Sequence, residues 1–397
     1  MSETGERAER GALGHLRIAD FSRILAGPLA TMVMGDLGAD VVKVEQPGVG
    51  DDTRSWGPPW WEVDGRPTST YYLGLNRNKR SIALDLADPP DLEVARRLCL
   101  EADVVVDNFR VGTMERFGLD RGSLIEDRPD LITCSITGFG STGDGASLAG
   151  YDFLVQAMSG LMAITGEADG EPMKVGAAVV DKLAGLYAAV AILAAVEERR
   201  ETGLGQHVEV SLMGAALAGL LNVGSAHVTT NADPGRHGNR HPSIVPYQSY
   251  RASDGQVVIA AASPVLWQRL CEVLEHPDLA VDTRFVDNAA RLQNADALEA
   301  EIESVLAPGT VAEWTGRLRA EGIPAGPINS VREAFATAGD LGLDPVWVMG
   351  DGTDAYRSVG SPIRMSATPP TARRRPPSND EHGPEIRREI SERSEER

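Results

Sequence analysis

Cysteine is scarce in this sequence, and its few copies are not arranged for cross-linking or for binding a metal. Cys99, Cys134 and Cys271 are the only three cysteines in 397 residues. They stand far apart, with no CxxC pair and no histidine cluster beside them. The sequence therefore predicts neither a disulfide framework nor a metal site. A reducing compartment, the cytoplasm, fits this pattern.

Long hydrophobic runs and several well-known active-site motifs are also missing. The N-terminus, MSETGERAERG, is charged and lacks the apolar core of a signal peptide. The longest apolar run, around residues 183–196, is too short to span a bilayer. No GxSxG elbow or Walker loop occurs, and the turn after the first expected strand, Arg23 to Gly27, does not match the GxGxxG fingerprint. We therefore expect no membrane partner and no standard dinucleotide site.

Positive charge and aromatic side chains are in short supply as well. Lys and Arg number 38 against 58 Asp and Glu, which gives a net charge of −20. This balance opposes general binding to nucleic acid, and an aromatic content of 5% leaves no stacking ladder for single strands. A polyanionic ligand would need a local basic patch.

The length and the hydrophobic pattern predict an α/β protein of two domains. A hydrophobic content of 42% over 397 residues is enough for two cores. Strands are expected at 16–22, 39–45, 103–109 and 131–140, with helices at 28–37 and 89–102 between them. This alternation is typical of a parallel, Rossmann-like sheet, which we assign to residues 1–224. Residues 225–335 read as a smaller α+β domain, with a hairpin around residues 254–255 and helices at 264–275, 295–306 and 310–320. The remaining residues, 336–397, form a third segment that ends in a charged tail.

Asp181 stands at the boundary between two apolar segments. Residues 175–180 read as a short buried strand or extended segment, and residues 183–196 as a buried helix that ends at Gly203. An Asp at this place commonly caps the first turn of a helix, and that explanation is the stronger one from the residues alone. The small neighbours Gly176 and Gly185 would, however, let a bulky ligand approach the carboxylate.

Three further stretches carry groups suited to an anionic ligand. The turn from Arg23 to Gly27 opens onto a helix N-terminus, where backbone N–H groups can hold a phosphate. Residues 76–80, NRNKR, combine cations and amides before a strand, although this could equally be a solvated strand entry. The stretch DNFRVGTMERFG, residues 107–118, follows another strand, and ligands bind at such ends in open α/β sheets.

These stretches also carry a resemblance to a known family. The patterns GAAxxDxxAGxxAAxAILAA, DFSRxLAGP with GADVVKVE, and NRNKRSIALDL resemble the family III CoA-transferases, over roughly residues 14–390. The resemblance implies that Asp181 is the nucleophile. It also implies that coenzyme A is contacted by Arg23, Leu25, Ala26, Asn76, Lys79, Arg80, Asn108, Phe109, Arg116 and Tyr151. Leu25 departs from the formyl-CoA branch, which has Gln there, so any contact made by that Gln is absent.

The resemblance also implies a fold, a chemistry and partners. Family members are ring-shaped chains in interlocked homodimers, with a large Rossmann-like domain built from both termini, to which residues 336–397 would return. CoA moves from an acyl-CoA to a free carboxylic acid through an aspartyl anhydride and an aspartyl-CoA thioester, with CoA as substrate and no permanently bound cofactor. The helix N-terminus is expected to keep Asp181 ionised. The segment GNRHPSIVPYQ looks like that of transferases using succinyl-CoA or glutarate, so Arg236 and Arg240 could pair with a second carboxylate.

Two other functions stay open at this point. An α-methylacyl-CoA racemase shares the fold and the aligned Asp but needs a His, and its AGHD motif reads AGYD here, with Tyr151 in place of the His. A non-catalytic CoA-binding protein is the third reading, and retention of Asp181 argues against it.

Overall fold

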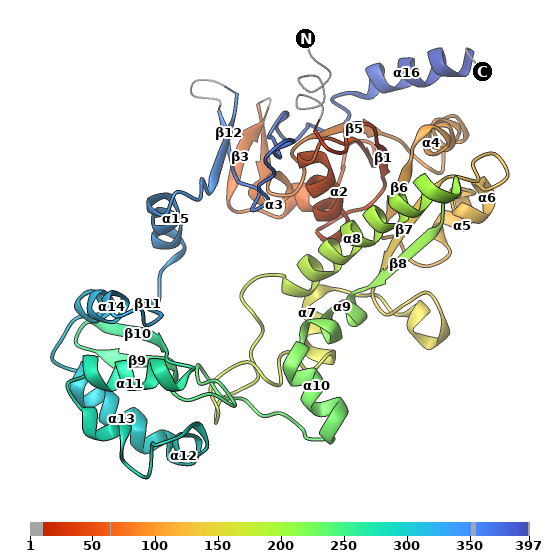
Figure 1. Cartoon of the computed structure of the whole chain (residues 1–397). Helices are drawn as coiled ribbons and strands as arrows, with labels where there is room; N and C mark the ends of the chain where they lie inside the picture. Colours follow the sequence, from red (N-terminus) through yellow and green to blue (C-terminus); the bar gives the residue numbers. More distant parts are fainter. Residues whose placement is uncertain (1–10, 64, 351–354, 396–397) are drawn as a thin grey trace. The chain divides into compact units, whose positions relative to one another are not determined.

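The computed structural model describes residues 11–63, 65–350 and 355–395 (Figure 1). The chain divides into two compact units. Unit 1 takes the segment that ends at Leu161, Lys174–Ala232 and the segment from Asp344 onward, and unit 2 takes Met162–Met173 and Asp233–Leu343. The sequence prediction placed the two boundaries after residues 224 and 335. It did not foresee that residues 162–173 join the second unit.

Unit 1 is built on a six-stranded sheet in which every neighbouring pair of strands is parallel. The order across the sheet is β5-β2-β1-β6-β7-β8, so the chain reverses its direction of growth between β1 and β6. This confirms the predicted α/β class with a parallel central sheet. The strands are β1 (Arg17–Asp20), β2 (Asp40–Glu45), β5 (Lys79–Ala83), β6 (Val104–Asp107), β7 (Ile132–Thr137) and β8 (His207–Ser211).

Helices cover both faces of this sheet because alternate strand residues point to opposite sides. On one face the even-numbered residues of β1 and β6, such as Ile18 and Val104, pack under α2 (Ala26–Asp36), α8 (Val179–Thr202) and α9 (Leu212–Gly219). On the other face Ala19 and Val105 meet α4 (Pro89–Glu101), α5 (Thr113–Phe117), α6 (Arg121–Leu124) and α16 (Gly383–Glu395). Figure 1 shows α2 and α8 together on one side of the sheet.

The helix α8 is long and apolar enough, by length and composition, to cross a membrane. It packs on the sheet with α2 and α9, however, and Ala184, Ala188 and Ile192 on its inner side are buried. Gly203 ends the helix in the left-handed conformation, as predicted. α8 is therefore the core helix of unit 1.

Two sequence-based assignments around α8 were wrong. Residues 175–178 form no strand and none of them is buried: Gly176 and Ala177 are exposed, and Val175 and Ala178 are half-buried. The apolar stretch MGAALAGLLNVGSA, residues 213–226, by its composition predicts one buried helix after β8, but it forms α9 and α10 (Leu221–Thr230), bent by 86° at their junction. No residue of α10 is buried, and Leu221 and Val228 are 71% and 85% exposed.

The C-terminal segment of the chain crosses back over unit 1. Asn78, just before β5, accepts hydrogen bonds from the N–H groups of Arg373 and Arg374 and donates one to the carbonyl of Thr371. The N–H of His382 then donates to the carbonyl of Ser81 within β5. This C-terminal strap, residues 371–382, leads into α16. Unit 1 is therefore completed by both ends of the chain.

Smaller elements complete unit 1. They are η1 (Asp52–Ser55), β3 (Trp60–Val63), β4 (Arg66–Ser69), α3 (Thr70–Leu73), η2 (Gly143–Ser147), α7 (Asp152–Met158), β12 (Val346–Met349) and β13 (Tyr356–Val359). β3 pairs with β4 and β12 with β13, each antiparallel.

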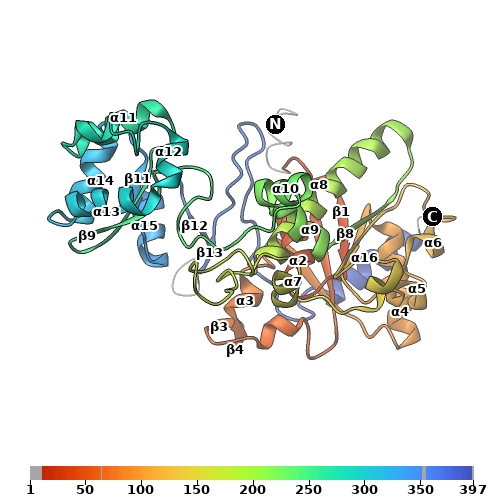
Figure 2. The same cartoon turned by 90° about the horizontal axis from the view of Figure 1, so that it is seen from below.

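Unit 2 has its own sheet and its own core. The predicted hairpin is present as β9 (Tyr247–Ala252) and β10 (Gly255–Ala260), and β11 (Ala325–Pro327) adds a third antiparallel strand. Figure 2 shows the helices gathered around this sheet. They are α11 (Pro264–Val273), η3 (Pro277–Ala280), α12 (Asn288–Gln293), α13 (Ala295–Leu306), α14 (Val311–Ala320) and α15 (Val331–Asp340).

Candidate active site

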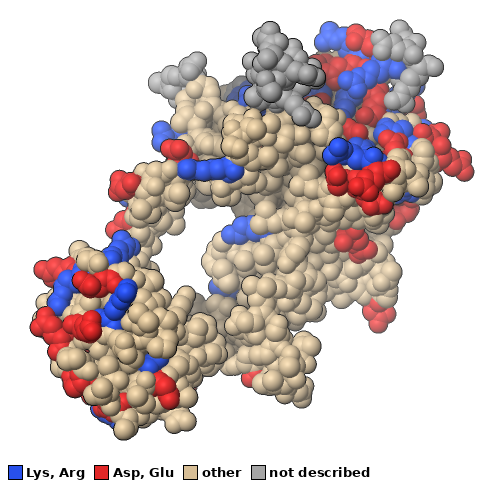
Figure 3. Space-filling view, viewed as in Figure 1, with Lys and Arg blue, Asp and Glu red and all other residues tan. Residues whose placement is uncertain are grey.

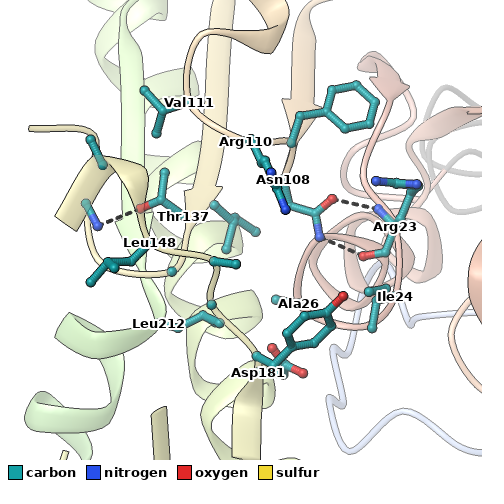
Figure 4. Close-up of a pocket in the computed structure, with 18 of the residues that line it drawn as sticks. Arg23, Ile24, Ala26, Asn108, Arg110, Val111, Thr137, Leu148, Asp181 and Leu212 are labelled. Atoms are coloured by element: carbon teal, nitrogen blue, oxygen red, sulfur yellow. Dashed lines mark hydrogen bonds between the residues drawn. The ribbon is translucent and has the colours of Figure 1, made fainter. Parts of the chain in front are cut away.

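A cavity of about 320 Å³ lies in unit 1 where the sheet reverses its order (Figure 4). The turns that follow β1, β6 and β7 all contribute to its wall, because the carboxyl ends of parallel strands meet at one edge of a sheet. Its lining residues are Arg23–Ala26, Asn108–Val111, Ile136–Gly138, Gly140, Ala146–Tyr151, Asp181 and Leu212. Crevices at this place are the usual ligand sites of open α/β sheets.

The turn after β1 is clamped to the end of β6 by one side chain. Asn108 accepts a hydrogen bond from the N–H of Arg23 at 2.8 Å and donates one to the carbonyl of Arg23 at 2.7 Å, as the dashed lines in Figure 4 show. The next residue, Ile24, has a φ of 71°, which is strained for a β-branched side chain. Asn108 therefore supports an unusual backbone at the mouth of the cavity.

Beneath this turn lies a cluster of ion pairs, which we call the buried ion-pair cluster: Asp20, Lys43, Asp51 and Lys79. Lys43 bonds Asp51 at 2.9 Å and Lys79 bonds Asp20 at 3.0 Å, and all four side chains are buried. Burial by itself raises the pKa of Asp51, but the Lys43 ammonium overcomes this and lowers it to about 2.

The buried ion-pair cluster holds the turn through its backbone. Lys43 donates to the carbonyl of Ser22 at 2.8 Å, and Asp20 accepts from the N–H of Ser22 at 3.0 Å. Both oxygens of Asp51 lie 3.3 Å from the N–H of Ile24. These contacts fix Ser22–Ile24 in one conformation, which is what a preorganised site requires.

Asp181 enters the cavity from the first turn of α8. One turn later, Gly185 lets α8 approach α2 so closely that a Cβ would come within 2.5 Å of the carbonyl oxygen of Ala26. Because residues four apart share one side of a helix, Asp181 is brought beside the N-terminus of α2. Figure 4 shows Asp181 next to Ala26 and Ile24.

The electrostatic surroundings of Asp181 differ from the sequence-based expectation. Burial, and after it the negative charge of Asp152, raises the pKa of Asp181 to about 7. The N-terminus of α8 was predicted to favour the ionised carboxylate, whereas burial and Asp152 both oppose its ionisation. The free N–H groups of the first turn are bonded to Asp152 instead of to Asp181.

A third wall of the cavity comes from two loops that cross at a pair of glycines. A Cβ on Gly138 would lie 2.6 Å from the Cα of Gly150, and one on Gly150 would lie 2.3 Å from the Cα of Gly138. Only glycine at both places lets the loop after β7 and the segment before α7 touch. Neither glycine was among the residues predicted for the site.

Three residues expected at the phosphates of coenzyme A have other roles. Lys79 is completely buried and bonds Asp20, the carbonyl of Pro28 and the side chain of Asn76, which is itself 0% exposed. Arg80 is 4% exposed and pairs with Asp40, Glu385 and Glu389. We therefore correct the prediction for Asn76, Lys79 and Arg80. A sequence cluster of cations before a strand cannot show which of them face inward.

The remaining predicted contacts fall into two groups. Leu25, Ala26, Phe109 and Tyr151 line the cavity together with Arg23 and Asn108. Arg116 is exposed on α5, where its guanidinium lies 4.7 Å from the centre of the Phe117 ring, and it is not part of the lining.

Arg110 lines the cavity but was not predicted. It is exposed, and its guanidinium forms no ion pair or hydrogen bond with the described residues, although its backbone carbonyl accepts from the N–H of Thr113. Its position could have been inferred from the sequence, because Arg110 lies three residues beyond the end of β6 and a ligand was expected at that end.

The two arginines proposed to read a second carboxylate are already engaged within unit 2. Arg240 pairs with Asp296 at 2.8 Å and with Glu299 at 2.5 Å. Arg236 donates to three backbone carbonyls, those of Ala163, Glu167 and Gly170. Both side chains therefore have structural roles in the described fold.

Comparison with known proteins agrees with this geometry. The model of CoA-transferase family III matches residues 13–383. The chain belongs to this family. It is 41% identical to the succinate–glutarate CoA-transferase of Agrobacterium fabrum over 95% of both chains. It is also 39% identical to the succinyl-CoA:mesaconate CoA-transferase of Haloarcula hispanica, over 95% of this chain and 96% of that one.

Solved structures of family III proteins share the fold. A CAIB/BAIF family protein from Brucella suis is 41% identical and superposes with a TM-score of 0.85, over 94% of this chain and 98% of that one. A protein from Mycobacterium tuberculosis is 32% identical, with a TM-score of 0.83 over 94% and 99% of the two chains. The predicted family is confirmed.

Membership of CoA-transferase family III makes the chain an acyl-CoA:carboxylate CoA-transferase, with coenzyme A as part of its substrate. Within the part of the chain that the structure describes, no group of three or more His, Cys, Asp or Glu side chains is placed to hold a metal ion.

Proposed function

We propose that this enzyme transfers coenzyme A between succinyl-CoA and a second dicarboxylic acid of similar size, with Asp181 as the nucleophile. Relatives that share 39–41% of its residues over nearly their whole length are named for succinate with glutarate or mesaconate. A further relative, from Acetobacter aceti, is named an acetyl-CoA:oxalate CoA-transferase and is 36% identical. Each of these names contains a dicarboxylic acid.

The single observation that carries the mechanism is the position of Asp181. It is the one carboxylate among the residues that line the cavity of unit 1. A carboxylate that attacks a thioester forms a mixed anhydride and releases the CoA thiolate. That thiolate then attacks the carbonyl of the Asp181 side chain, forms an aspartyl-CoA thioester and releases the first acid. The acceptor acid repeats these two steps in reverse.

The N-terminus of α2 is suited to the charge that develops on the thioester oxygen. Its first residue, Ala26, borders the cavity beside Asp181, and Leu25 before it provides no side-chain cap to the helix. Backbone N–H groups at such an end stabilise an oxyanion in a partly closed site. The clamp on Arg23 and the buried ion-pair cluster hold this end in place before substrate binds.

The cations and the aromatic ring at the cavity support one proposed path for the long CoA chain. Arg23 and Arg110 are its cations, and Phe109, beside Arg23, supplies an apolar surface. We propose that the pantetheine arm runs between the turns after β1 and β6, with the phosphates toward Arg110 and Arg116. This replaces the phosphate role first assigned to Asn76, Lys79 and Arg80.

The active enzyme is proposed to be an interlocked homodimer of ring-shaped chains. Unit 1 exposes a broad apolar surface on α7, α8, α9 and α10, and Figure 3 shows few charged side chains over α9 and α10. Monomeric proteins rarely leave so many large apolar residues uncovered. They are Phe153, Leu154, Met158, Leu186, Tyr187, Val190, Leu217, Leu221 and Val228. Light scattering at micromolar protein should give the dimer mass, unchanged by dilution, and a monomer would contradict the assembly.

The buried thiols of Cys99, Cys134 and Cys271 are free, which suits a reducing compartment, and we propose the cytoplasm.

Two experiments test the proposed function: trapping of the covalent intermediate and the activity of Asp181→Asn. The wild-type enzyme, incubated with succinyl-CoA and then with borohydride or hydroxylamine, should carry the modification on Asp181, located by peptide mapping. Asp181→Asn should lose at least about a thousandfold in transfer, because no other group can form the anhydride. The matched control is Asp127→Asn, an exposed carboxylate paired with Arg96, which should transfer normally.

Two outcomes would contradict the proposal. If Asp181→Asn still transfers CoA at a tenth of the wild-type rate, Asp181 is not the nucleophile. Enzyme-dependent uptake of deuterium at the α-carbon of a 2-methylacyl-CoA in D₂O would point to the racemase reaction instead. A matrix of acyl-CoA donors and free acids, read by mass spectrometry, then identifies the substrates.

A further inference from the structure

The first turn of α8 is capped by a carboxylate that belongs to another helix. Ala178, the residue before α8, has no side chain able to accept from the free N–H groups. Instead, one oxygen of Asp152, at the start of α7, accepts from the N–H of Val180 at 2.8 Å and from the N–H of Asp181 at 3.1 Å. The backbone that carries the Asp181 carboxylate is therefore fixed by Asp152.

The capping carboxylate is itself held in place. Its second oxygen accepts from the amide of Gln156 at 2.6 Å. The amide oxygen of Gln156 accepts from the N–H of Val175 at 2.9 Å, and Gln156 is 1% exposed. Asp152 thus joins α7, the segment before α8 and α8 itself into one hydrogen-bonded unit.

Asp181 has one negatively charged neighbour and one neutral titratable neighbour on the elements packed against it. Asp152 faces it from α7, and Tyr71 faces it from α3. Burial, followed by the charges of Asp181, Asp152 and Asp51, raises the pKa of Tyr71 to about 12, so its hydroxyl stays protonated. Among the described residues no cation contributes to the pKa shift of Asp181, whose causes are burial and Asp152.

Four other titratable side chains lie around the nucleophile. Arg23, Arg110 and Tyr151 line the same cavity, and Lys182, the next residue of α8, is exposed. Among the described residues, Asp152 is the one charged group that shifts the pKa of Asp181. It also holds the Asp181 backbone through a hydrogen bond.

We propose that Asp152 is a positioning residue that sets both the place of the nucleophile and the pH range in which the transferase works. This inference rests on the proposed role of Asp181. A second negative charge beside the nucleophile opposes its ionisation, which makes the carboxylate more basic and a better nucleophile once it is ionised. Loss of that charge, with the two hydrogen bonds to the N–H groups of Val180 and Asp181 kept, moves the active range to lower pH.

The test is the pH dependence of Asp152→Asn, which keeps an oxygen acceptor and removes the charge. The midpoint of kcat/KM against pH should fall by about 0.5 to 1 unit. The ratio of variant to wild-type kcat/KM should then be about three- to tenfold larger at pH 5.5 than at pH 8.5. A purely structural role would lower the rate by the same factor at both pH values. Asp152→Ser, neutral and also a good capping residue, is the second variant should the Asn form fail to fold.

Gln156→Leu is the matched control, because it removes a bond to Asp152 and keeps the charge. It should lower the melting temperature and leave the midpoint within about 0.2 unit. An unchanged midpoint in folded Asp152→Asn and Asp152→Ser would overturn the inference.

A direct titration of the Asp181 carboxyl separates this inference from the proposed function. Carbodiimide modification of Asp181, mapped against pH, reads its ionisation without any activity. A shifted titration together with active Asp181→Asn would refute the nucleophile and leave the electrostatic coupling intact. An unshifted titration together with inactive Asp181→Asn would refute only the coupling.

Discussion

Two groups of charged side chains lie within a few residues of each other in unit 1, and they behave in opposite ways. In the buried ion-pair cluster each carboxylate has its own cation, as in Lys79 with Asp20. In the cavity the carboxylate of Asp181 has no described cation beside it, and Arg110 has no described anion. The first group stabilises the turn between them, and the second is left with unsatisfied charge. Unsatisfied charge at a preorganised place is what a substrate can use.

The largest contrast should appear when one cation is removed from each group. Lys79→Met leaves Asp20 buried without its partner, and it should lower the free energy of unfolding by about 3–5 kcal/mol. Arg110→Met removes an exposed, unpaired cation and should change stability by less than about 0.5 kcal/mol. Urea unfolding of both variants measures the difference. Equal and small effects would mean that Lys79 is not part of the core.

The two aspartates should respond to neutralisation with opposite signs. In the buried ion-pair cluster, burial opposes the ionisation of Asp20, but Lys79 and Lys43 favour the charged form and lower its pKa. Asp20→Asn should therefore destabilise the protein at neutral pH. The pKa of Asp181 is raised to about 7, so its ionisation opposes folding. Wild-type stability then falls as pH rises from about 4 to 7, and Asp181→Asn escapes this loss. Its advantage should reach about 1–3 kcal/mol at pH 8 and shrink toward pH 5 in thermal unfolding.

Arg110 should contribute to the binding of acyl-CoA although it contributes little to the free energy of unfolding. Arg110→Ala should raise KM for acyl-CoA about tenfold, since a charge-assisted contact with a phosphate is lost. Succinyl-CoA and acetyl-CoA should be affected equally if Arg110 holds the CoA phosphates. A loss confined to succinyl-CoA would mean that it reads the second carboxylate instead. Arg97→Ala, an exposed cation paired with Glu93, is the control and should leave KM unchanged.

The smallest effect tests the turn that separates the two groups. At the φ of 71° found for Ile24, a glycine is unstrained and an alanine is not. Ile24→Gly should therefore be more stable than Ile24→Ala by about 1 kcal/mol, the reverse of the usual order in regular structure. Thermal unfolding of the pair measures it, and the usual order would show that the turn relaxes in solution.

The sequence was a good guide wherever a repeating pattern of apolar residues decides the structure. The strands of the parallel sheet, the end of α8 at Gly203 and the hairpin of β9 and β10 all follow from such patterns. It failed for α10, whose apolar residues are exposed in the single chain. A periodic apolar pattern shows which side chains are suited to burial. It does not show whether the residues that bury them belong to the same chain.

The candidate site was predictable only in part for a similar reason. Resemblance pointed to Asp181 and to the turns at Arg23 and Asn108, and the structure brings all three to one cavity. It could not show that Lys79 is buried while Arg110 lines the cavity, because a sequence motif does not show which way each side chain points. It also missed Asp152, which is 29 residues from Asp181 and acts through a backbone hydrogen bond.

The C-terminal strap has a consequence for how the chain is made. Asn78, just before β5, and Ser81, within it, bond residues 371–382, which the ribosome makes only after the whole of unit 2. Before then the ribosome must synthesise all of Asp233–Leu343, roughly 110 residues, which takes about 5–20 s at usual rates. Throughout that time β5 is an outer strand without its cover, and an uncovered edge strand can pair with another nascent chain. Unit 2 can complete its core while unit 1 still waits, so the unit whose translation begins first finishes folding last.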